Sequence, residues 1–350
     1  MALLNSVIND AVELISSKES TKKQLVELLL PLKKELVKPV NEINVSSRIG
    51  GVDSGFVAKK LSFIDLVLIR TSGIVFNYEN SILKNAEYLP CFFEFPSPHL
   101  VNNALEDDEL NISKSLMRLK EEVGMAKQLI EKKCKYVFLD GSIVPQYQDQ
   151  PRKDSKINAL YNSIIDEFTS MYELAEKNNC SLIAFIEDSR GSRFAQLLKE
   201  NHSSELKGKE NLLEGLLDPS FLDLYLLKGE RTIPFTYTKN ISQHAILKDF
   251  PNKWSEKVHA LYLKPTEFDR PLRIEFLSSE NDLEKKADEF SSIAFALSSF
   301  HREYAYPAPL IEADLRARLK PEEIDTIYNK IQDKLSKSIK LKLRRNSRPF

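Results

Sequence analysis

Apolar and polar positions repeat with different periods along the chain. In residues 2 to about 40, apolar side chains recur every three or four positions, a spacing that predicts helices. From Arg48 onward the pattern changes to short apolar runs, and "RIGGVDSGFVAKK" predicts a strand that carries a turn. The stretch "LSFIDLVLIRTSGIVFNYE" predicts two further strands that meet at Ser72-Gly73, and "FPSPH" predicts an irregular segment over residues 81 to 105.

Helices and strands alternate in the part of the chain that follows. Residues 107 to 133 predict a long amphipathic helix, whose apolar stripe consists of Leu116, Leu119, Val123, Ala126 and Ile130. A strand from Tyr136 to Leu139, a helix near 154 to 178 and the strand "SLIAFIED" come next. Three strands followed by helix, strand, helix and strand predict a ribonuclease H-like (PIWI-like) α/β fold, a mixed sheet flanked by helices.

The same pattern predicts three consecutive parts of the chain. Residues 1–45 form an N-terminal helical extension, residues 46–320 the central domain, and residues 321–350 a C-terminal helix with a basic tail. The extension is expected to be a helical hairpin outside the main sheet. It either offers a contact to a partner or to a second copy, or merely covers the core.

Composition restricts the cellular setting more than the activity. The 50 basic and 51 acidic residues leave a net charge of −1, so that any nucleic-acid surface must be local. Cys91, Cys134 and Cys180 form no CxxC pair, which indicates reduced cysteines and no zinc site. No apolar run approaches the roughly 18 residues that span a bilayer, and the N-terminus lacks the features of a signal peptide. We therefore expect a soluble cytoplasmic protein.

Two aspartates follow or interrupt strands that this fold brings together. In a ribonuclease H-like sheet, the first strand lies beside the strand that follows the first long helix. Asp53 and Asp140 would then meet at one end of the sheet, and the intervening helix could add Glu121 or Glu122. The plainer interpretation is that Asp140-Gly141 is an ordinary turn and that both glutamates lie on a solvated helix face.

A cluster of three carboxylates would need a compensating charge, because like charges raise one another's pKa. Oxygen ligands suit the divalent ions Mg²⁺ and Mn²⁺. Two such ions about 4 Å apart can activate water and stabilise the leaving oxygen in phosphodiester cleavage. The strand that ends at Asp140 would hold this carboxylate in a fixed position, and the turn at Gly141 would expose it to the metal ion.

Five motifs in order give the chain a resemblance to a known family. They are "GGVDSGF", then "RLKEE" with "YVFLDGS", "LIAFIEDSRGSRF", "FLDLYLLKGERTIPF" and "YPAPLIEADLRARL". The chain resembles the NurA nucleases over roughly residues 45 to 320. The resemblance implies a manganese-dependent, homodimeric nuclease with 5′ to 3′ exonuclease and single-strand endonuclease activity on DNA. It also implies a HerA-type hexameric ATPase as partner in the resection of double-strand break ends.

The resemblance also implies the metal ligands. The family's aspartates correspond to Asp53 and Asp140, and its helix glutamate corresponds to Glu121 or Glu122. Where the family commonly carries a histidine in the C-terminal helix, this chain carries Asp314, a residue that can also ligate Mn²⁺. We expect Asp314 to share the inward side of this helix with Leu310 and Leu315.

DNA binding would need basic side chains near the carboxylates, to hold the phosphate groups. The alternative interpretation is that each candidate is an ordinary solvated charge. The candidates are Arg190, Arg193, Lys228, Arg231 and the tail "SIKLKLRRNSRPF".

Two functions remain open at this point: a metal-dependent DNA nuclease, or a catalytically weak adaptor that binds DNA or regulates a motor ATPase. The chain has no phosphate-binding glycine loop, so an ATP-driven step would need a partner.

Overall fold

The structure is a computed structural model that describes residues 2–102, 105–206, 208–335, 341 and 343. Contacts divide the chain into two compact units. The first consists of Met1–Asn44, Phe185–Lys239 and Lys257–Pro307, and the second consists of Val45–Ala184, Asn240–Glu256 and Ala308–Phe350. The three consecutive domains expected from the sequence stay a prediction.

The second unit contains a mixed sheet. Its strands are β2 (Arg48–Lys60), β3 (Ile64–Glu79), β4 (Ile82–Leu89), β5 (Ser97–Asn102) and β6 (Tyr136–Asp140). β2 pairs with β3 in antiparallel register along its whole length, while β6 runs parallel to β2 on its other side. The outer edge of β3 pairs with β4 in one half and with β5 in the other. This order confirms the predicted ribonuclease H-like fold.

The strand boundaries differ from those expected. β2 carries no turn, and β3 continues through Ser72-Gly73 without a break. In the ladder Asp53 lies opposite Ser72 and Ser54 lies opposite Thr71, so that pairing between two long strands outweighs the local preference of these residues for turns. The segment 81–105, expected to be irregular, contains β4 and β5, which the long β3 provides with an edge to pair against.

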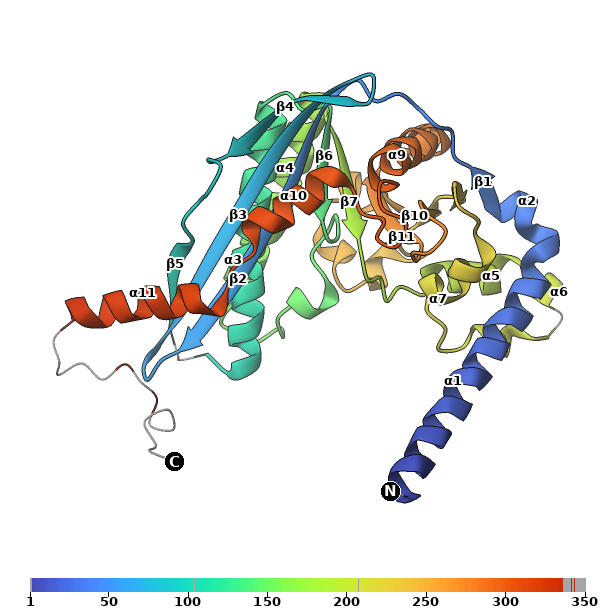
Figure 1. The fold of residues 1–350 in the computed structure, drawn as a ribbon, viewed down its shortest axis with the longest axis horizontal. Helices are drawn as coiled ribbons and strands as arrows, with labels where there is room; N and C mark the ends of the chain where they lie inside the picture. Colours follow the sequence, from blue (N-terminus) through green and yellow to red (C-terminus); the bar gives the residue numbers. More distant parts are fainter. Residues whose placement is uncertain (1, 103–104, 207, 336–340, 342, 344–350) are drawn as a thin grey trace. The chain divides into compact units, whose positions relative to one another are not determined.

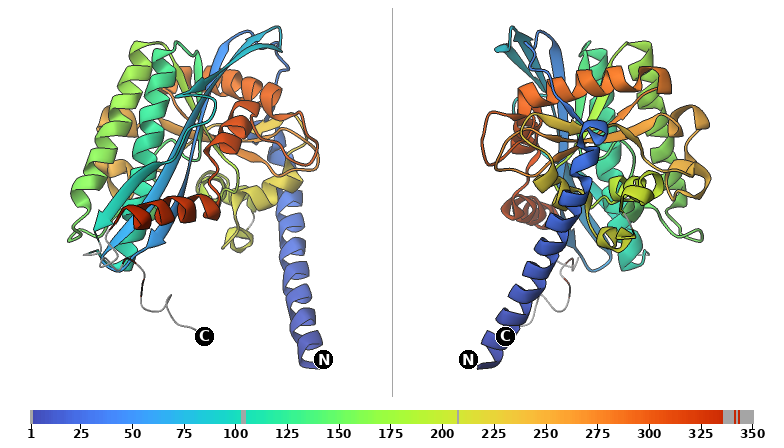
Figure 2. Two further views of the ribbon diagram at one scale, coloured as in Figure 1. Left: turned by 60° about the vertical axis from the view of Figure 1, so that its left-hand side comes forward. Right: turned by 90° about the vertical axis from the view of Figure 1, so that its right-hand side faces the viewer.

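Helices cover the sheet of the second unit. They are α3 (Asp107–Glu131), α4 (Asn158–Lys177), the short α8 (Asn252–Ser255), α10 (Ala308–Ala317) and α11 (Pro321–Lys334). All five predicted stripe residues of α3 are buried. α3 and α10 lie on opposite faces of β2 and β3 (Figure 1), and α4 lies along α3 (Figure 2). The predicted helices near 107–133 and 154–178 are thereby confirmed.

The first unit contains antiparallel strands. Its strands are β1 (Val37–Pro39), β8 (Glu230–Thr232), β9 (Phe235–Thr236), β10 (Val258–Lys264) and β11 (Leu272–Leu277). β10 pairs with β11, β8 and β9, and β8 pairs with β1. Its helices are α1 (Ala2–Leu29), α2 (Lys33–Leu36), α5 (Arg193–Asn201), α6 (Ser203–Leu206), α7 (Asp218–Tyr225) and α9 (Leu283–Ser298). In β7 (Ser181–Ile186) the chain passes from the second unit to the first.

The N-terminal segment is not the helical hairpin that the sequence predicted. α1 is one 28-residue helix, and β1 follows it after two short turns of helix. Leu25 and Leu29 are buried in the core of the first unit together with Leu222 of α7, whereas Val12 and Ile15 are exposed. Only the C-terminal part of α1 therefore covers the core. Among the described residues, none of the helices combines the length and the apolar composition required to cross a lipid bilayer.

Candidate active site

One face of β2 lies directly against the backbone of α10. A Cβ atom at Gly51 would come within 2.6 Å of the carbonyl oxygen of Pro309, and one at Gly55 within 2.6 Å of that of Ala317. The two glycines are four residues apart in the strand, a rise of about 13 Å, and their two partners are eight residues apart in the helix, a rise of about 12 Å. The strand and the helix therefore stay in contact over this length. Because side chains alternate along a strand, Asp53 points to the same face, toward the middle of α10.

The opposite face of β2 meets α3 through side chains. The hydroxyl of Ser54 donates a hydrogen bond to Glu122 Oε2 over 2.6 Å, and Arg118 Nη1 donates to the same oxygen over 2.6 Å. Arg118 also donates to Ser54 Oγ over 3.2 Å. Arg118 and Glu122 are one helical turn apart, the spacing at which side chains of a helix meet. The carboxylate of Glu122 is thereby held at the sheet.

β6 ends beside Asp53. The register pairs Val52 with Leu139, so that Asp53 and Asp140 follow at adjacent positions of two parallel strands and on the same face of the sheet. Gly141 has φ +100°, a conformation that favours glycine, and the chain turns away there. The predicted strand that ends on a carboxylate and a turn is therefore present.

The loop after this turn returns to α3. The buried carboxylate of Asp149 accepts hydrogen bonds from Ser115 Oγ over 2.6 Å and from the backbone N–H of Gln146 over 2.8 Å. These bonds tie the loop to the helix that carries Arg118 and Glu122.

Two carboxylates of this site have a raised pKa. Burial raises the pKa of Asp53 to about 7, and the charges of Glu122 and Asp314 add to this effect while Arg118 opposes it. Burial also raises the pKa of Glu122, against the influence of Arg118 and Ser54 and together with the charge of Asp140. Arg118 is the cation that partly compensates this charge, and the charge of Glu122 raises its pKa in turn.

The structure separates the two candidate glutamates of α3. Glu122 is buried in the cluster, whereas Glu121 is exposed and lies 3.9 Å from Nε2 of His99. Glu121 lines a different pocket of about 360 Å³ together with Arg70, Phe95 and Lys120. Of the two residues left open by the sequence, Glu122 is the one that the fold buries against β2, where it bonds Ser54 and its charge acts on Asp53.

Asp314 lies on α10 near the cluster but in a more open position than expected. Its side chain is exposed, yet its charge contributes to the raised pKa of Asp53. Leu310 is fully buried, as the sequence predicted, whereas Leu315 is 61% exposed. The expectation that Leu315 shares the inward stripe is wrong, because residues five positions apart on a helix point about 140° apart.

The four predicted DNA-binding cations belong to the first unit. Arg190, in the loop after β7, and Lys228, after α7, are exposed. Arg193 is paired with Glu200 and donates to the carbonyl oxygen of Thr236. Arg231 is fully buried and contacts Asp288, Glu284 and the carbonyl oxygen of Thr232, so its guanidinium cannot reach a phosphate in this conformation. Most of the predicted basic tail lies outside the described residues.

A divalent cation fits the donor chemistry of the cluster. Asp53, Glu122, Asp140 and Asp314 offer carboxylate oxygens alone, which hard cations prefer. Their charges disfavour one another, and a cation would relieve this. Among the described residues, no group of three or more Asp, Glu, His or Cys side chains is already arranged to hold a metal ion. Glu122 would have to exchange at least one of its present partners for the metal.

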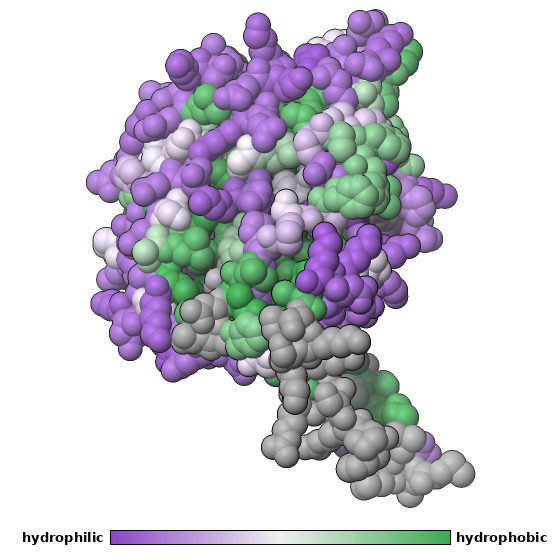
Figure 3. All heavy atoms as spheres, turned by 90° about the vertical axis from the view of Figure 1, so that its left-hand side faces the viewer, coloured by the Kyte–Doolittle hydropathy of each residue, from purple (hydrophilic) through white to green (hydrophobic). Residues whose placement is uncertain are grey.

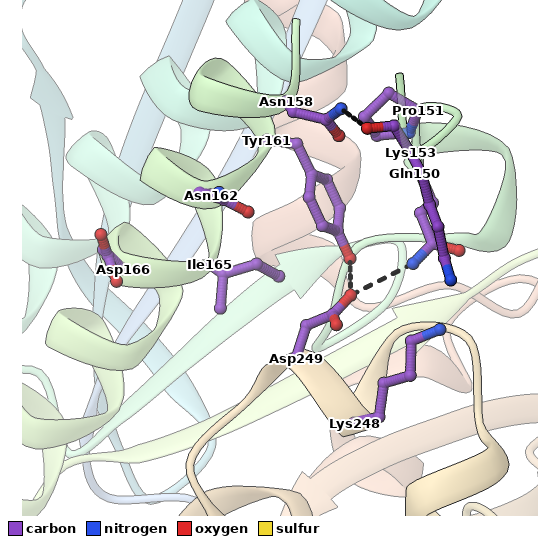
Figure 4. A pocket seen from close by; sticks show the side chains of 10 residues that line it. All are labelled: Gln150, Pro151, Lys153, Asn158, Tyr161, Asn162, Ile165, Asp166, Lys248 and Asp249. Atoms are coloured by element: carbon purple, nitrogen blue, oxygen red, sulfur yellow. Dashed lines mark hydrogen bonds between the residues drawn. The ribbon is translucent and has the colours of Figure 1, made fainter. Parts of the chain in front are cut away.

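A polar pocket of about 370 Å³ lies elsewhere in the second unit. Tyr161 of α4 donates a hydrogen bond to Asp249 Oδ2 over 2.9 Å, and Gln150 donates to the same oxygen over 3.1 Å (Figure 4). Lys153 and Lys248 also line this pocket. None of the clustered carboxylates lines it, so we do not assign the candidate active site to this pocket.

Sequence reasoning missed the residues that surround the carboxylates. The i, i+4 spacing of Arg118 and Glu122 within "RLKEE" indicates their ion pair. The glycines at positions 51 and 55, on the same side of a strand as Asp53, indicate the close approach of another backbone. Ser54 and Asp149 have no comparable local pattern, because their partners are 68 and 34 residues away.

Comparison with known proteins identifies the family. The model of the NurA domain matches residues 47–319. The structure resembles that of the NurA nuclease from Sulfolobus solfataricus with a TM-score of 0.62 and 15% identity, over 95% of this chain and 98% of that one. It resembles a crystal structure of NurA with manganese with a TM-score of 0.54 and 10% identity, over 95% of this chain and 99% of that one. It also resembles a crystal structure of NurA bound to dAMP and manganese, with a TM-score of 0.53 and 11% identity, over 95% of this chain and 97% of that one. No curated protein matches the sequence significantly.

The chain has the ribonuclease H-like fold with a carboxylate cluster at the end of a central strand. It belongs to the NurA family, as the motifs predicted.

Proposed function

We propose that this protein is a metal-dependent nuclease that hydrolyses phosphodiester bonds of DNA. The observation that supports the proposal is the adjacent position of Asp53 and Asp140 on the paired strands β2 and β6, together with a pKa of Asp53 that burial and the charge of Glu122 raise to about 7. Membership of the NurA family supports it, as do the related structures that contain manganese and dAMP.

Each residue of the site has a part in this chemistry. Asp53, Asp140 and Glu122 would hold divalent cations, and Asp314 would add a carboxylate from α10, on the face of β2 to which Asp53 points. Such ions, when bound, activate the attacking water and stabilise the leaving oxygen. Arg118 orients Glu122 through the hydrogen bond between them. The glycines of β2 keep α10, and with it Asp314, close to Asp53.

The finer parts of the proposal follow from the family. We propose Mn²⁺ as the preferred ion, with Mg²⁺ as an alternative, and two ions per site. The substrates are single-stranded and double-stranded DNA, degraded from 5′ to 3′, with endonuclease activity on single strands. The protein acts as a homodimer with a HerA-type hexameric ATPase in the resection of DNA ends. Arg190, Arg193 and Lys228 are proposed DNA contacts. Arg231 is withdrawn from this set because it is buried.

Cleavage of end-labelled single-stranded DNA tests the proposal. The wild-type protein should cleave with Mn²⁺ and not with EDTA. Asp53→Asn and Asp140→Asn should abolish cleavage and leave the protein folded. Glu122→Gln should lose most activity, while Glu121→Gln is the matched control, since adjacent helical residues point about 100° apart and Glu121 faces another pocket.

Two outcomes would contradict the nuclease. Unchanged cleavage by Asp53→Asn would assign any activity to another site. A wild-type protein that binds DNA and does not cleave it with either ion would instead support the adaptor.

A further inference from the structure

The segment between β4 and β5 presents three phenylalanine rings to solvent. This aromatic segment, residues 90–96, reads "PCFFEFP". Phe92 is 59% exposed, Phe93 is 58% exposed and Phe95 is 77% exposed. Figure 3 shows the side of the molecule on which β4 and β5 lie, where hydrophobic side chains gather in patches bordered by polar ones. Large apolar side chains that are exposed together indicate a binding surface.

The aromatic segment is anchored to the helices next to it. Arg70, whose side chain is buried, donates a hydrogen bond to the carbonyl oxygen of Glu94 over 2.8 Å and another to that of Arg318 over 3.0 Å. Its third contact is an ion pair with Glu323 of α11, and its guanidinium lies 5.0 Å from the ring centre of Phe93. The rings are therefore held in place on the surface, and their exposure does not follow from a loose loop.

A cation of α10 lies against these rings. The guanidinium of Arg316 is 3.8 Å from the ring centre of Phe92 and 5.0 Å from that of Tyr88. Glu312, one turn earlier in α10, accepts two hydrogen bonds from Arg316 and fixes its orientation. The surface thus combines aromatic rings with a flat cation. This is the combination on which proteins stack unpaired bases, because every base has a π face.

The position of this surface connects it with the carboxylates. Arg316 is two residues from Asp314 in α10, and the backbone of α10 lies directly against β2 at Gly51 and Gly55, on either side of Asp53. β4, which carries Tyr88, pairs with β3, the neighbour of the strand that carries Asp53. A nucleic-acid strand at the carboxylates would therefore have its neighbouring nucleotides near the aromatic segment.

We propose that the aromatic segment and Arg316 bind the unpaired bases of a nucleic-acid strand by stacking and hold that strand at the carboxylates. This inference rests on the proposed nuclease function and assigns it a strand-holding surface. It favours single strands over intact duplexes, because the bases of a duplex are already stacked on one another. A protein that docks on the same rings is the competing occupant, and the experiment below separates the two.

Binding of single-stranded DNA in EDTA tests the inference without cleavage. Phe92→Ala, Phe93→Ala and Arg316→Lys should each weaken binding by about tenfold, measured by fluorescence anisotropy. Lysine keeps the charge of Arg316 and loses its flat stacking surface. An oligonucleotide that carries the fluorescent base 2-aminopurine should be quenched on binding to the wild type and less quenched by the variants. Phe63→Ala is the matched control, since Phe63 is 57% exposed at the turn between β2 and β3; its affinity should equal that of the wild type.

The outcomes distinguish this inference from the nuclease proposal. Wild-type cleavage together with unchanged affinity and quenching in the three variants would overturn the stacking surface and leave the nuclease proposal standing. A change of oligomeric state in light scattering, with unchanged DNA affinity, would assign the rings to a protein contact and overturn it too. A wild type that neither binds nor cleaves DNA would overturn both. Unfolding temperatures equal to that of the wild type would show that the exposed rings do not stabilise the fold.

Discussion

The two faces of β2 hold their helices by different means. Toward α10 the strand offers Gly51 and Gly55, and the backbone of the helix comes so close that a methyl group would not fit. Toward α3 it offers Ser54, which joins the ion pair of Arg118 and Glu122. The first contact depends on shape and cannot adjust, whereas the second depends on charge and responds to pH and to ions. Asp53 points toward the rigid contact with α10, and Glu122 belongs to the adjustable contact with α3.

The charge on Asp53 should give the largest effect. Its pKa is about 7 in the folded state against an ordinary value of 3.8, so that the folded state retains the proton to a higher pH than the unfolded state. The free energy of unfolding without metal should therefore fall as pH rises from about 4 to about 7, by no more than about 4 kcal/mol, and stay lowered above that.

Urea unfolding in EDTA at pH 5 and pH 8 measures this effect. Asp53→Asn should be more stable than the wild type at pH 8, with a smaller difference at pH 5. Added Mn²⁺ should stabilise the wild type and have little effect on the variant. A difference between the two proteins that does not change with pH would exclude a raised pKa at Asp53.

The ion pair on the α3 face should give the next largest effect. Arg118→Met would leave the buried carboxylate of Glu122 without its cation and should lower the free energy of unfolding by about 3 kcal/mol at pH 8. The loss should be smaller near pH 5, because the pKa of Glu122 is already raised and the group can then take up a proton. Arg118→Lys should lose less, and Lys22→Met, in a more exposed pair, should be nearly neutral. A loss independent of pH would assign Arg118 a packing role alone.

The shape contact on the α10 face should give an intermediate effect. Gly55→Ala should lower stability by about 1–3 kcal/mol, because a backbone carbonyl group must move, and should slow cleavage as α10 shifts. Gly50→Ala, which meets the movable side chain of Leu129, should cost less. Gly124→Ala in α3 meets nothing within 4 Å and should stabilise the protein by up to about 1 kcal/mol. If Gly55→Ala and Gly50→Ala lowered the free energy of unfolding equally, the contact of β2 with α10 would be no more rigid than its contact with α3.

Asp314 should give the smallest effect, because its side chain is exposed. Asp314→Ala should slow cleavage by about tenfold, which corresponds to about 1.4 kcal/mol, without a change in stability. Asp314→His should remain active, since imidazole can also ligate Mn²⁺. The measurement is the cleavage rate across a Mn²⁺ titration. An alanine variant that cleaves at the wild-type rate at every concentration would remove Asp314 from the site.

Parts of the fold and of the site could be read from local patterns. The stripe from Leu116 to Ile130 predicts α3, because helical periodicity is a property of neighbouring residues. The order of strands and helices predicts the pairing of β2 with β6, and therefore the meeting of Asp53 with Asp140. The same reasoning failed at Ser72-Gly73, where the local preference for a turn lost against a 13-residue ladder.

What the sequence determined by itself is the two long helices α3 and α4, the ribonuclease H-like order of the central elements and the two aspartates that this order places on neighbouring strands, since these follow from periodicity and order. The tertiary structure alone decided that Glu122 and not Glu121 reaches the site, that Arg231 is buried, and that Arg70 anchors an exposed aromatic segment. These outcomes depend on contacts between residues far apart in the chain. Helix rotation and side-chain burial, which decide such contacts, are determined by packing and not by local spacing.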